Sequence, residues 1–251
     1  MHNALGFPDL LRLIDERPTA FRAAVSSAPS LDAQVPTCPD WTLHDLAKHI
    51  GQGRRVWAAT VAAGPDATAK ATLTDAPAPP REREALDAWL AESTQALLDA
   101  LREAGPDRGC WVGWGDSQSP RTCGAVARHQ VQELAVHTYD AQVTAGDPRP
   151  LPDEVALDGV DEFLVTCVAT SSAWPNEPAT IEYHVPEGGS WRIRPDADGA
   201  RIGPAEGAAS VSVTASASDF VLWFYGRAEP EAKKLDGDAR VIDQIIAWEP
   251  A

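Results

Sequence analysis

Positive charge is scarce in this sequence. It carries 21 lysines and arginines against 37 aspartates and glutamates, which gives a formal net charge of −16 at pH 7. Such an acidic surface repels phosphate backbones and anionic lipids, so we expect no binding to nucleic acid and none to a membrane. An anionic substrate would have to be held against this field by local arginines or by a metal ion.

Long apolar runs and paired cysteine motifs are also missing. No stretch approaches the roughly 18 apolar residues of a membrane span, and the first residues lack the basic and apolar regions of a secretory signal. The four cysteines, none in a CxxC motif, are Cys38, Cys110, Cys123 and Cys167. We therefore expect a cytoplasmic protein without disulfides, whose cysteines are small core residues rather than catalytic thiols.

Helical periodicity, by contrast, is abundant in the first part of the chain. Apolar residues recur at helical spacing in four segments, which predicts helices over residues 8–28, 43–61, 82–103 and 122–143. The prolines of residues 36–42 predict a turn, after which Thr42 can cap the second helix with Asp45 at its third position. Loops are expected over residues 64–80 and 105–121. Four antiparallel helices of this kind predict a bundle.

The pattern changes after a further helix predicted at residues 153–169. Residues 178–214 contain short alternating segments that are typical of strands, and two more helices are expected to follow them. The sequence thus predicts an α+β protein, with a helical domain over residues 1–170 and a small α+β domain with an antiparallel sheet over residues 171–251.

The segment ARHQVQELAVHTYDAQ (residues 127–142) spaces His129, Glu133 and His137 four residues apart. Each such step advances about 40° around a helix and about 6 Å along it, so Glu133 and His137 project side by side and can share a divalent ion. His49, at the edge of the apolar face of the second predicted helix, is the candidate third ligand. The alternatives are an ordinary i, i+4 ion pair for Glu133 and His137, and a core histidine for His49.

Three stretches carry a likeness to a known family. They are VPTCPDWTLHDLAKHIG at residues 35–51, QELAVHTYDAQ at 132–142 and DFVLWFYGRAE…LDGDARVIDQI at 219–245. Together they resemble the mycothiol-dependent, maleylpyruvate isomerase-like family, a branch of the DinB-like superfamily of four-helix bundles. The resemblance implies a DinB-like bundle at the N-terminus and a metal site of two histidines and one glutamate. The corresponding ligands in this chain are His49, Glu133 and His137.

The resemblance also implies cofactors: a divalent metal, typically zinc, and mycothiol, a cysteine-bearing sugar pseudodisaccharide. The sequence departs from the family beside the ligands. Many members have a histidine where this chain has Gln132, and Arg-Trp where it has Thr138 and Tyr139. These changes leave the ligands intact and alter the surroundings that would select a substrate.

Five further residues are candidates for the site. The resemblance implies that Arg227 faces the metal pocket and binds a substrate carboxylate; the alternative is a cation that compensates a helix dipole. His129 is expected beside the ligands or on the pocket wall rather than as a fourth ligand, and we assign it to catalysis with Arg227. Asp140 is expected either to orient a metal ligand or to be a surface acid. With Trp111 and Trp114, which we place at the pocket mouth, it is assigned to cofactor binding.

The leading hypothesis is an enzyme in which a divalent metal activates mycothiol, or a related thiol, for isomerisation of a small electrophile or for transfer to it. Two alternatives remain open. The same site can activate water in a hydrolase, or the bundle can be a non-catalytic module that binds a metal or a small molecule. The expected partners are the electrophile and the thiol, and the expected assembly is a monomer or a homodimer.

Overall fold

The computed structural model describes residues 5–68, 70–72, 78–114, 116–186, 188–203, 207–230 and 233–248. Contacts between residues divide these into two compact units. The bundle unit comprises Leu5–Gly113 and Arg121–Leu151, and the sheet unit comprises Trp114–Pro120 and the chain from Pro152 onward. The helical domain expected from the sequence extends further, to residue 170. Residues 69 and 73–77 of the predicted loop 64–80 lie outside the described residues.

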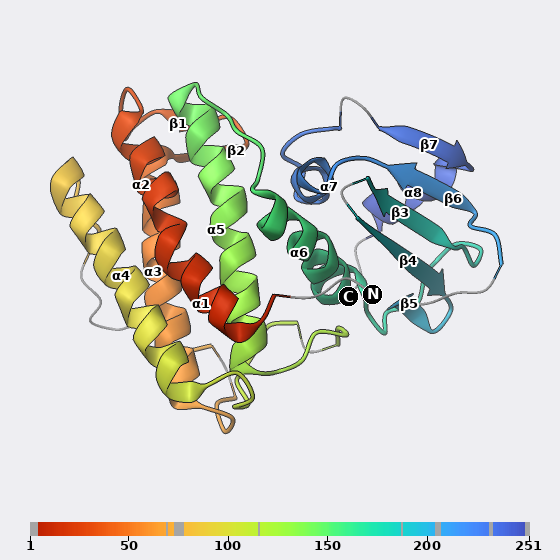
Figure 1. Ribbon diagram of the computed structural model, residues 1–251, viewed down its shortest axis with the longest axis horizontal. Helices are drawn as coiled ribbons and strands as arrows, with labels where there is room; N and C mark the ends of the chain where they lie inside the picture. The colour runs from red at the N-terminus through yellow and green to blue at the C-terminus, as the bar shows by residue number, and fades with distance from the viewer. Residues whose placement is uncertain are drawn as a thin grey trace. The chain divides into compact units, whose positions relative to one another are not determined.

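Within the described residues the bundle unit contains five helices (Figure 1): α1 (Phe7–Glu16), α2 (Pro18–Ser27), α3 (Leu43–Ala63), α4 (Arg83–Ala104) and α5 (Cys123–Ala145). α3 packs along α4, while α1 and α2 both contact α5. The single helix predicted over residues 8–28 is two helices, because Pro18 has no backbone N–H to continue α1 and instead takes the first position of α2. The helical N-terminal bundle is thus confirmed, with its first helix broken.

A short hairpin, rather than a plain turn, leads into α3. β1 (Gln34–Val35) pairs antiparallel with β2 (Cys38–Thr42). Thr42 then caps α3: its hydroxyl accepts a hydrogen bond from the backbone N–H of Asp45, whose carboxylate accepts one from the N–H of Thr42. This capping box confirms the predicted cap. The hairpin thereby fixes Cys38 and Trp41 next to the helix that carries His49.

The close approach of α3 to α4 depends on a glycine. A Cβ built on Gly51 would lie 1.9 Å from Cζ3 of Trp89 on α4, so no larger residue fits while that ring stays in place. Arg55, one turn further along α3, lies over the same ring, with its guanidinium carbon 5.3 Å from the centroid. These contacts set the position of α3, and therefore of His49.

The sheet unit begins with α6 (Asp153–Phe163), which continues into a π-helical turn, η1 (Leu164–Val168). Its strands are β3 (Ile181–Val185), β4 (Gly189–Asp196), β5 (Gly199–Ile202), β6 (Val211–Thr214) and β7 (Lys234–Gly237), in the order β5-β4-β3-β6-β7. The sheet differs from the expected antiparallel one because β3 and β6 are parallel. The chain reaches β6 by a crossover past β4 and β3 rather than by a hairpin.

One face of this sheet is buried and the other is partly open. Tyr183 of β3 pairs with Trp191 of β4, and both side chains are buried. On the opposite face Glu182 pairs with Arg192, and this half-buried pair forms an ion pair at 3.2 Å. Nε1 of Trp191 donates to a carboxylate oxygen of Asp161 at 3.0 Å, so α6 covers the buried face. An antiparallel or mixed sheet with one covered face shows this alternation.

Two helices, α7 (Ala217–Phe224) and α8 (Ala239–Ala247), complete the sheet unit in agreement with the sequence. The rings of Phe220 and Phe224 on α7 lie 5.3 and 5.2 Å from that of Tyr183, so α7 also packs on the buried face. Among the described residues, no helix combines the length and apolar character that crossing a membrane would need.

Candidate metal centre

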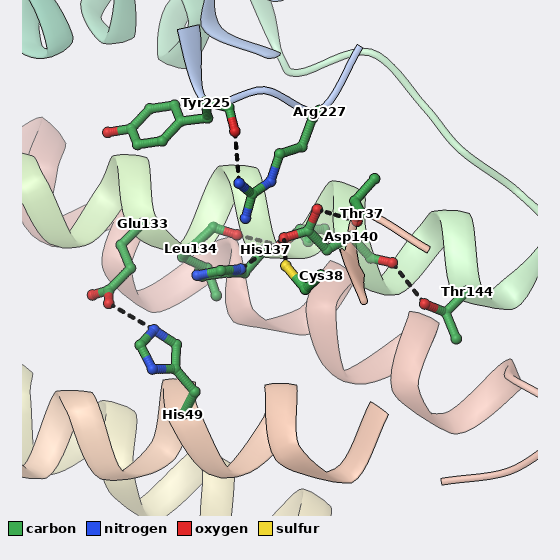
Figure 2. A network of polar contacts seen from close by, with 11 residues as sticks. Thr37, Cys38, His49, Glu133, Leu134, His137, Asp140, Thr144, Tyr225 and Arg227 are labelled. Carbon is green, nitrogen blue, oxygen red and sulfur yellow. Dashed lines mark hydrogen bonds and ion pairs between the residues drawn. The ribbon is translucent and has the colours of Figure 1, made fainter. Parts of the chain in front are cut away.

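The three side chains predicted as metal ligands lie together in the bundle unit, on facing helices. His49 projects from α3, whereas Glu133 and His137 lie one turn apart on α5 (Figure 2). Nε2 of His49 is 3.2 Å from Oε1 of Glu133, and the ring centroids of His49 and His137 are 5.0 Å apart. The structure therefore brings the predicted set together, while its role in holding a metal stays a prediction.

His137 is held by a buried acid on its own helix. Its Nδ1 lies 2.8 Å from Oδ2 of Asp140, whose side chain is fully buried. The hydroxyl of Thr37 donates to Oδ1 of Asp140 at 2.6 Å, and Sγ of Cys38 lies 3.6 Å from Oδ2. Figure 2 shows the other ring nitrogen of His137 on the side of Glu133 and His49. Asp140 is thus no surface acid: it fixes the ring and leaves Nε2 on the side of the predicted ligands.

Asp140 and His137 also belong to a second donor set. Among the described residues, ligand atoms of Cys38, His137 and Asp140 all lie within 4.8 Å of one another, which makes them a candidate metal-binding triad. His137 is common to both sets and would use Nδ1 in this one. The two sets would use different nitrogens of His137, because Nδ1 faces Asp140 and Nε2 lies on the side of Glu133.

Sequence reasoning missed Cys38 and Trp41, which β2 brings to the site. Cys38 is partly exposed and next to Asp140, although the cysteines were interpreted as small core residues. The ring of Trp41 lies 4.8 Å from that of His49 and 6.0 Å from that of His137, so it packs against both. The only signal available was the position of both residues in the stretch 35–51, since nothing local links Cys38 to an acid 102 positions away.

The carboxyl of Glu133 is held in its charged form. Burial alone would raise its pKa, but the hydrogen bond from His49 and the charges of His129, His49 and His137 outweigh this and lower it to about 2. Gln130 also donates to its second oxygen, Oε2. An ionised carboxylate beside two imidazoles is a donor set that suits a divalent ion such as zinc.

Arg54 supplies a buried positive charge one turn after the glycine contact on α3. Burial lowers its pKa to about 10, against the opposing influence of the Glu133 charge. It donates to the hydroxyl of Thr94 on α4. The chain thus places a permanent cation near the ionised Glu133 within an otherwise acidic protein.

A cavity of about 450 Å³ opens beside the His49–Glu133 pair. Gly53 and Val56 of α3 form part of its wall, and Lys70 brings a cation to it. The ammonium of Lys70 lies 4.8 Å above the centroid of the Trp57 ring, which holds it by a cation–π contact. Cavities of this size accept small organic molecules.

His129 and Trp111 both lie near Trp57. The ring of His129 is half-buried, 6.5 Å from that of Trp57, and its charge acts on Glu133. The ring centroids of Trp111 and Trp57 lie 6.3 Å apart, and Trp111 lines a second cavity of about 510 Å³. His129 is therefore close to the predicted ligands, while the catalytic role of His129 and the cofactor-binding role of Trp111 stay predictions.

Arg227 and Trp114 belong to the sheet unit. Arg227 follows α7; its backbone N–H donates to the carbonyl of Leu222 at 2.7 Å and its guanidinium to that of Tyr225 at 2.6 Å (Figure 2). The carbonyl of Trp114 accepts from the N–H of Ser117 at 3.1 Å. Their expected functions at the metal pocket therefore stay predictions.

Comparison with protein families matches most of the chain. A model described as the mycothiol maleylpyruvate isomerase N-terminal domain matches residues 11–142, and one described as the MDMPI C-terminal domain matches residues 154–244. No curated protein matches the sequence.

Solved structures give the same picture of the fold. A crystal structure of the mycothiol-dependent maleylpyruvate isomerase is 14% identical and has a TM-score of 0.59, over 95% of this chain and 98% of that chain. A variant of that isomerase with one histidine replaced by alanine has a TM-score of 0.60, with the same identity and coverage. At this identity the likeness shows a common fold.

Proposed function

We propose, because the chain belongs to the mycothiol maleylpyruvate isomerase family, that it is a metal-dependent enzyme that uses a low-molecular-weight thiol. The metal would be a divalent ion such as zinc, and the thiol mycothiol or a close relative. The second substrate would be a small electrophile that is isomerised through reversible thiol addition or becomes conjugated to the thiol. The free thiols of the four cysteines agree with a cytoplasmic enzyme.

The observation that carries this proposal is the hydrogen bond between His137 and Asp140 beside the His49–Glu133 pair. It fixes Nδ1 of His137, so that Nε2 remains for a metal, as in carboxylate–histidine–metal arrangements. Nε2 of His49 and the ionised Glu133 complete a set of two nitrogens and one oxygen. Three protein ligands leave a position open for an exogenous ligand, as in catalytic zinc sites.

The residues around this set suit a thiol and an anionic electrophile. The bound ion would supply Lewis acidity, lowering the pKa of a thiol so that it is a thiolate at neutral pH. Lys70 would attract a carboxylate into the cavity next to His49 and Glu133, which offsets the net charge of −16. Trp41 would shield the two imidazoles on the side of β2.

The test is metal content together with thiol-dependent turnover. We expect about one divalent ion per chain by elemental mass spectrometry, and isomerisation of maleylpyruvate only when mycothiol is added. His49→Ala should lose both. His44→Gln is the matched control on α3, because His44 is bonded to the carbonyl of Pro80 and takes no part in the donor set; it should keep both.

The remaining outcomes distinguish the alternatives. Ester hydrolysis that requires the metal but no thiol would favour a hydrolase. Failure to bind zinc after reconstitution would contradict the metal centre and favour a binding module. Metal binding and thiol-dependent conjugation of other electrophiles, with no action on maleylpyruvate, would keep the mechanism and change only the substrate.

A further inference from the structure

The sheet unit contains a cavity of its own, formed entirely from its own elements. It has a volume of about 370 Å³ and lies between the buried face of the sheet, the end of α6 with η1, α7 and α8. Tyr183 of β3 and Ile193 of β4 form its floor. Small-molecule sites in proteins have volumes from about 300 Å³ upward, so this one suits a compact ligand.

The walls of this cavity are aromatic and carry no charge. Five of the lining side chains are aromatic: Phe163, Tyr183, Trp223, Phe224 and Trp248. The ring of Phe163 is stacked on that of Phe224 at 5.0 Å, and that of Tyr183 meets Phe224 edge-on at 5.2 Å. No lining residue is charged at neutral pH, because burial raises the pKa of both the Cys167 thiol and the Tyr183 phenol. An ionic ligand would therefore lose its hydration without gaining an opposite charge.

Tyr183 brings one polar group to this cavity without a protein partner. The residue is 4% exposed, and in the described residues its hydroxyl makes no hydrogen bond. Its oxygen is not fully enclosed by protein atoms and has access to the cavity. Tyrosine hydroxyls in such surroundings usually find a hydrogen-bond partner. Burial raises the pKa of this phenol, so it stays protonated and can donate. A ligand with an acceptor would satisfy it.

The helix that borders the cavity is distorted at the same place. The N–H of Ala169 bonds to the carbonyl of Leu164 at 2.9 Å, five residues back, which makes η1 a π-helical turn. Such turns are rare and frequent at functional sites. Here the widened turn carries Leu164, Cys167 and Val168 along the cavity, and Cys167 is exposed.

We propose that this cavity is a binding site for an uncharged, flat aromatic molecule of one or two rings that carries a hydrogen-bond acceptor. The rings would pack in offset or edge-on contact with Phe163, Phe224 and Trp223. The acceptor would take the hydrogen bond that the Tyr183 hydroxyl lacks. All residues of this site belong to the sheet unit, whereas the predicted metal ligands belong to the bundle unit, and the proposal does not depend on the thiol chemistry proposed above.

The probe for the test is 6-propionyl-2-(dimethylamino)naphthalene, an uncharged two-ring ketone whose emission reports polarity. We expect saturable binding of one molecule to the full chain, with a shift of its emission to the blue. 2-Naphthoate, which has a similar ring system and a negative charge, should bind at least about tenfold more weakly because its carboxylate would be desolvated with no cation beside it, even if the Tyr183 hydroxyl donates to it. Equal binding of the two would overturn the proposal.

Two variants locate the probe. Tyr183→Phe removes only the hydroxyl and should weaken binding of the ketone about five- to tenfold, while 2-(dimethylamino)naphthalene, which lacks the carbonyl, should lose less than about twofold. Cys167→Phe should fill the mouth of the cavity and weaken both ligands, whereas Cys167→Ser should not. Unchanged affinity of the ketone in Tyr183→Phe would contradict the predicted hydrogen bond.

Alkylation compares two cysteines of the same molecule, one at the proposed site and one in the bundle unit. The bound ketone should slow the reaction of Cys167 with N-ethylmaleimide, measured by peptide mass spectrometry, and leave Cys38 in the bundle unit unchanged. Equal protection of both cysteines, or of neither, would contradict binding at this site. Tight binding of a saturated fatty alcohol in place of the aromatic probes would also overturn it, because the occupant would then be an aliphatic chain.

Discussion

The two sides of His137 differ in access to solvent. On one side His49 and Glu133 have side chains 37% and 20% exposed and border a cavity. On the other side Asp140 is fully buried, and its carboxylate oxygens contact Thr37, Cys38 and His137 itself. The open side borders a cavity that a small ligand could enter, whereas on the buried side the carboxylate of Asp140 holds the ring of His137. On this comparison we predict that the same histidine would bind a metal through Nε2 while its Nδ1 is held by Asp140.

Replacing the shared residue should have the largest effect. His137→Ala removes a donor from both sets, so it should weaken metal binding by more than the roughly 10–100-fold typical of an outer hydrogen-bond partner, and abolish turnover. Competition with a chromophoric chelator measures the affinity. His184→Ala on the open face of the sheet is the control. Full metal affinity in His137→Ala would refute both donor sets.

Asp140→Asn weakens the hydrogen bonding that orients His137 and should have the next largest effect. An amide offers one acceptor where the carboxylate accepts on both oxygens, so the ring of His137 loses its orientation and metal affinity should fall roughly 10–100-fold. Asp147→Asn, at an exposed acid just beyond α5, should change nothing. Complete loss of the metal in Asp140→Asn would instead favour Asp140 as a direct ligand.

In the metal-free protein, acid should remove the contribution of Glu133 to the free energy of unfolding. The folded-state pKa of Glu133 is lowered from 4.5 to about 2, because His49 and the neighbouring charges outweigh burial. Its stabilising contribution is therefore fully present above pH 4.5 and is lost as the pH falls toward 2. Urea unfolding at several pH values measures this effect. The difference in the free energy of unfolding between wild type and Glu133→Gln should shrink as the pH falls from 4.5 toward 2.

Glu92 provides the control, since its exposed ion pair with Arg55 is of the kind that contributes little, and Glu92→Gln should leave the free energy of unfolding nearly unchanged. A constant difference between wild type and Glu133→Gln down to pH 3 would mean that the carboxyl is not held in its charged form in the folded protein.

Cys38→Ser should have the smallest effect and separates the two donor sets most directly. If His49, Glu133 and His137 hold the metal, the hydroxyl of serine can still face Asp140, and metal affinity should change by less than the roughly tenfold loss that marks an outer partner. If Cys38, His137 and Asp140 hold it, the thiolate is lost and the metal should go with it. Elemental mass spectrometry of the variant decides between these results.

Local rules predicted much of the fold and one side of the site. Glu133 and His137 share a helix, so their spacing alone placed them side by side. The cap by Thr42 and Asp45 likewise depends on neighbouring residues. His49 could be found because the apolar face of its helix indicates which side meets the bundle.

Features that depend on distant parts of the chain were not predictable in this way. Cys38 meets Asp140 across 102 positions, through a hairpin that the sequence suggested only as a turn. β7 consists of four exposed residues, so its sequence shows no alternation. The parallel pairing of β3 and β6 follows from the path of the chain, which no local pattern records.

Gly51 shows how a residue without any reactive group can limit the mutational freedom of the site. Because the ring of Trp89 occupies the space where its side chain would be, even alanine would displace either that ring or α3 itself, two residues after His49. In a saturation library selected for metal binding, position 51 should tolerate as few substitutions as the ligands themselves. Only a smaller residue at position 89 should relax that restriction, so the two positions would change together or not at all.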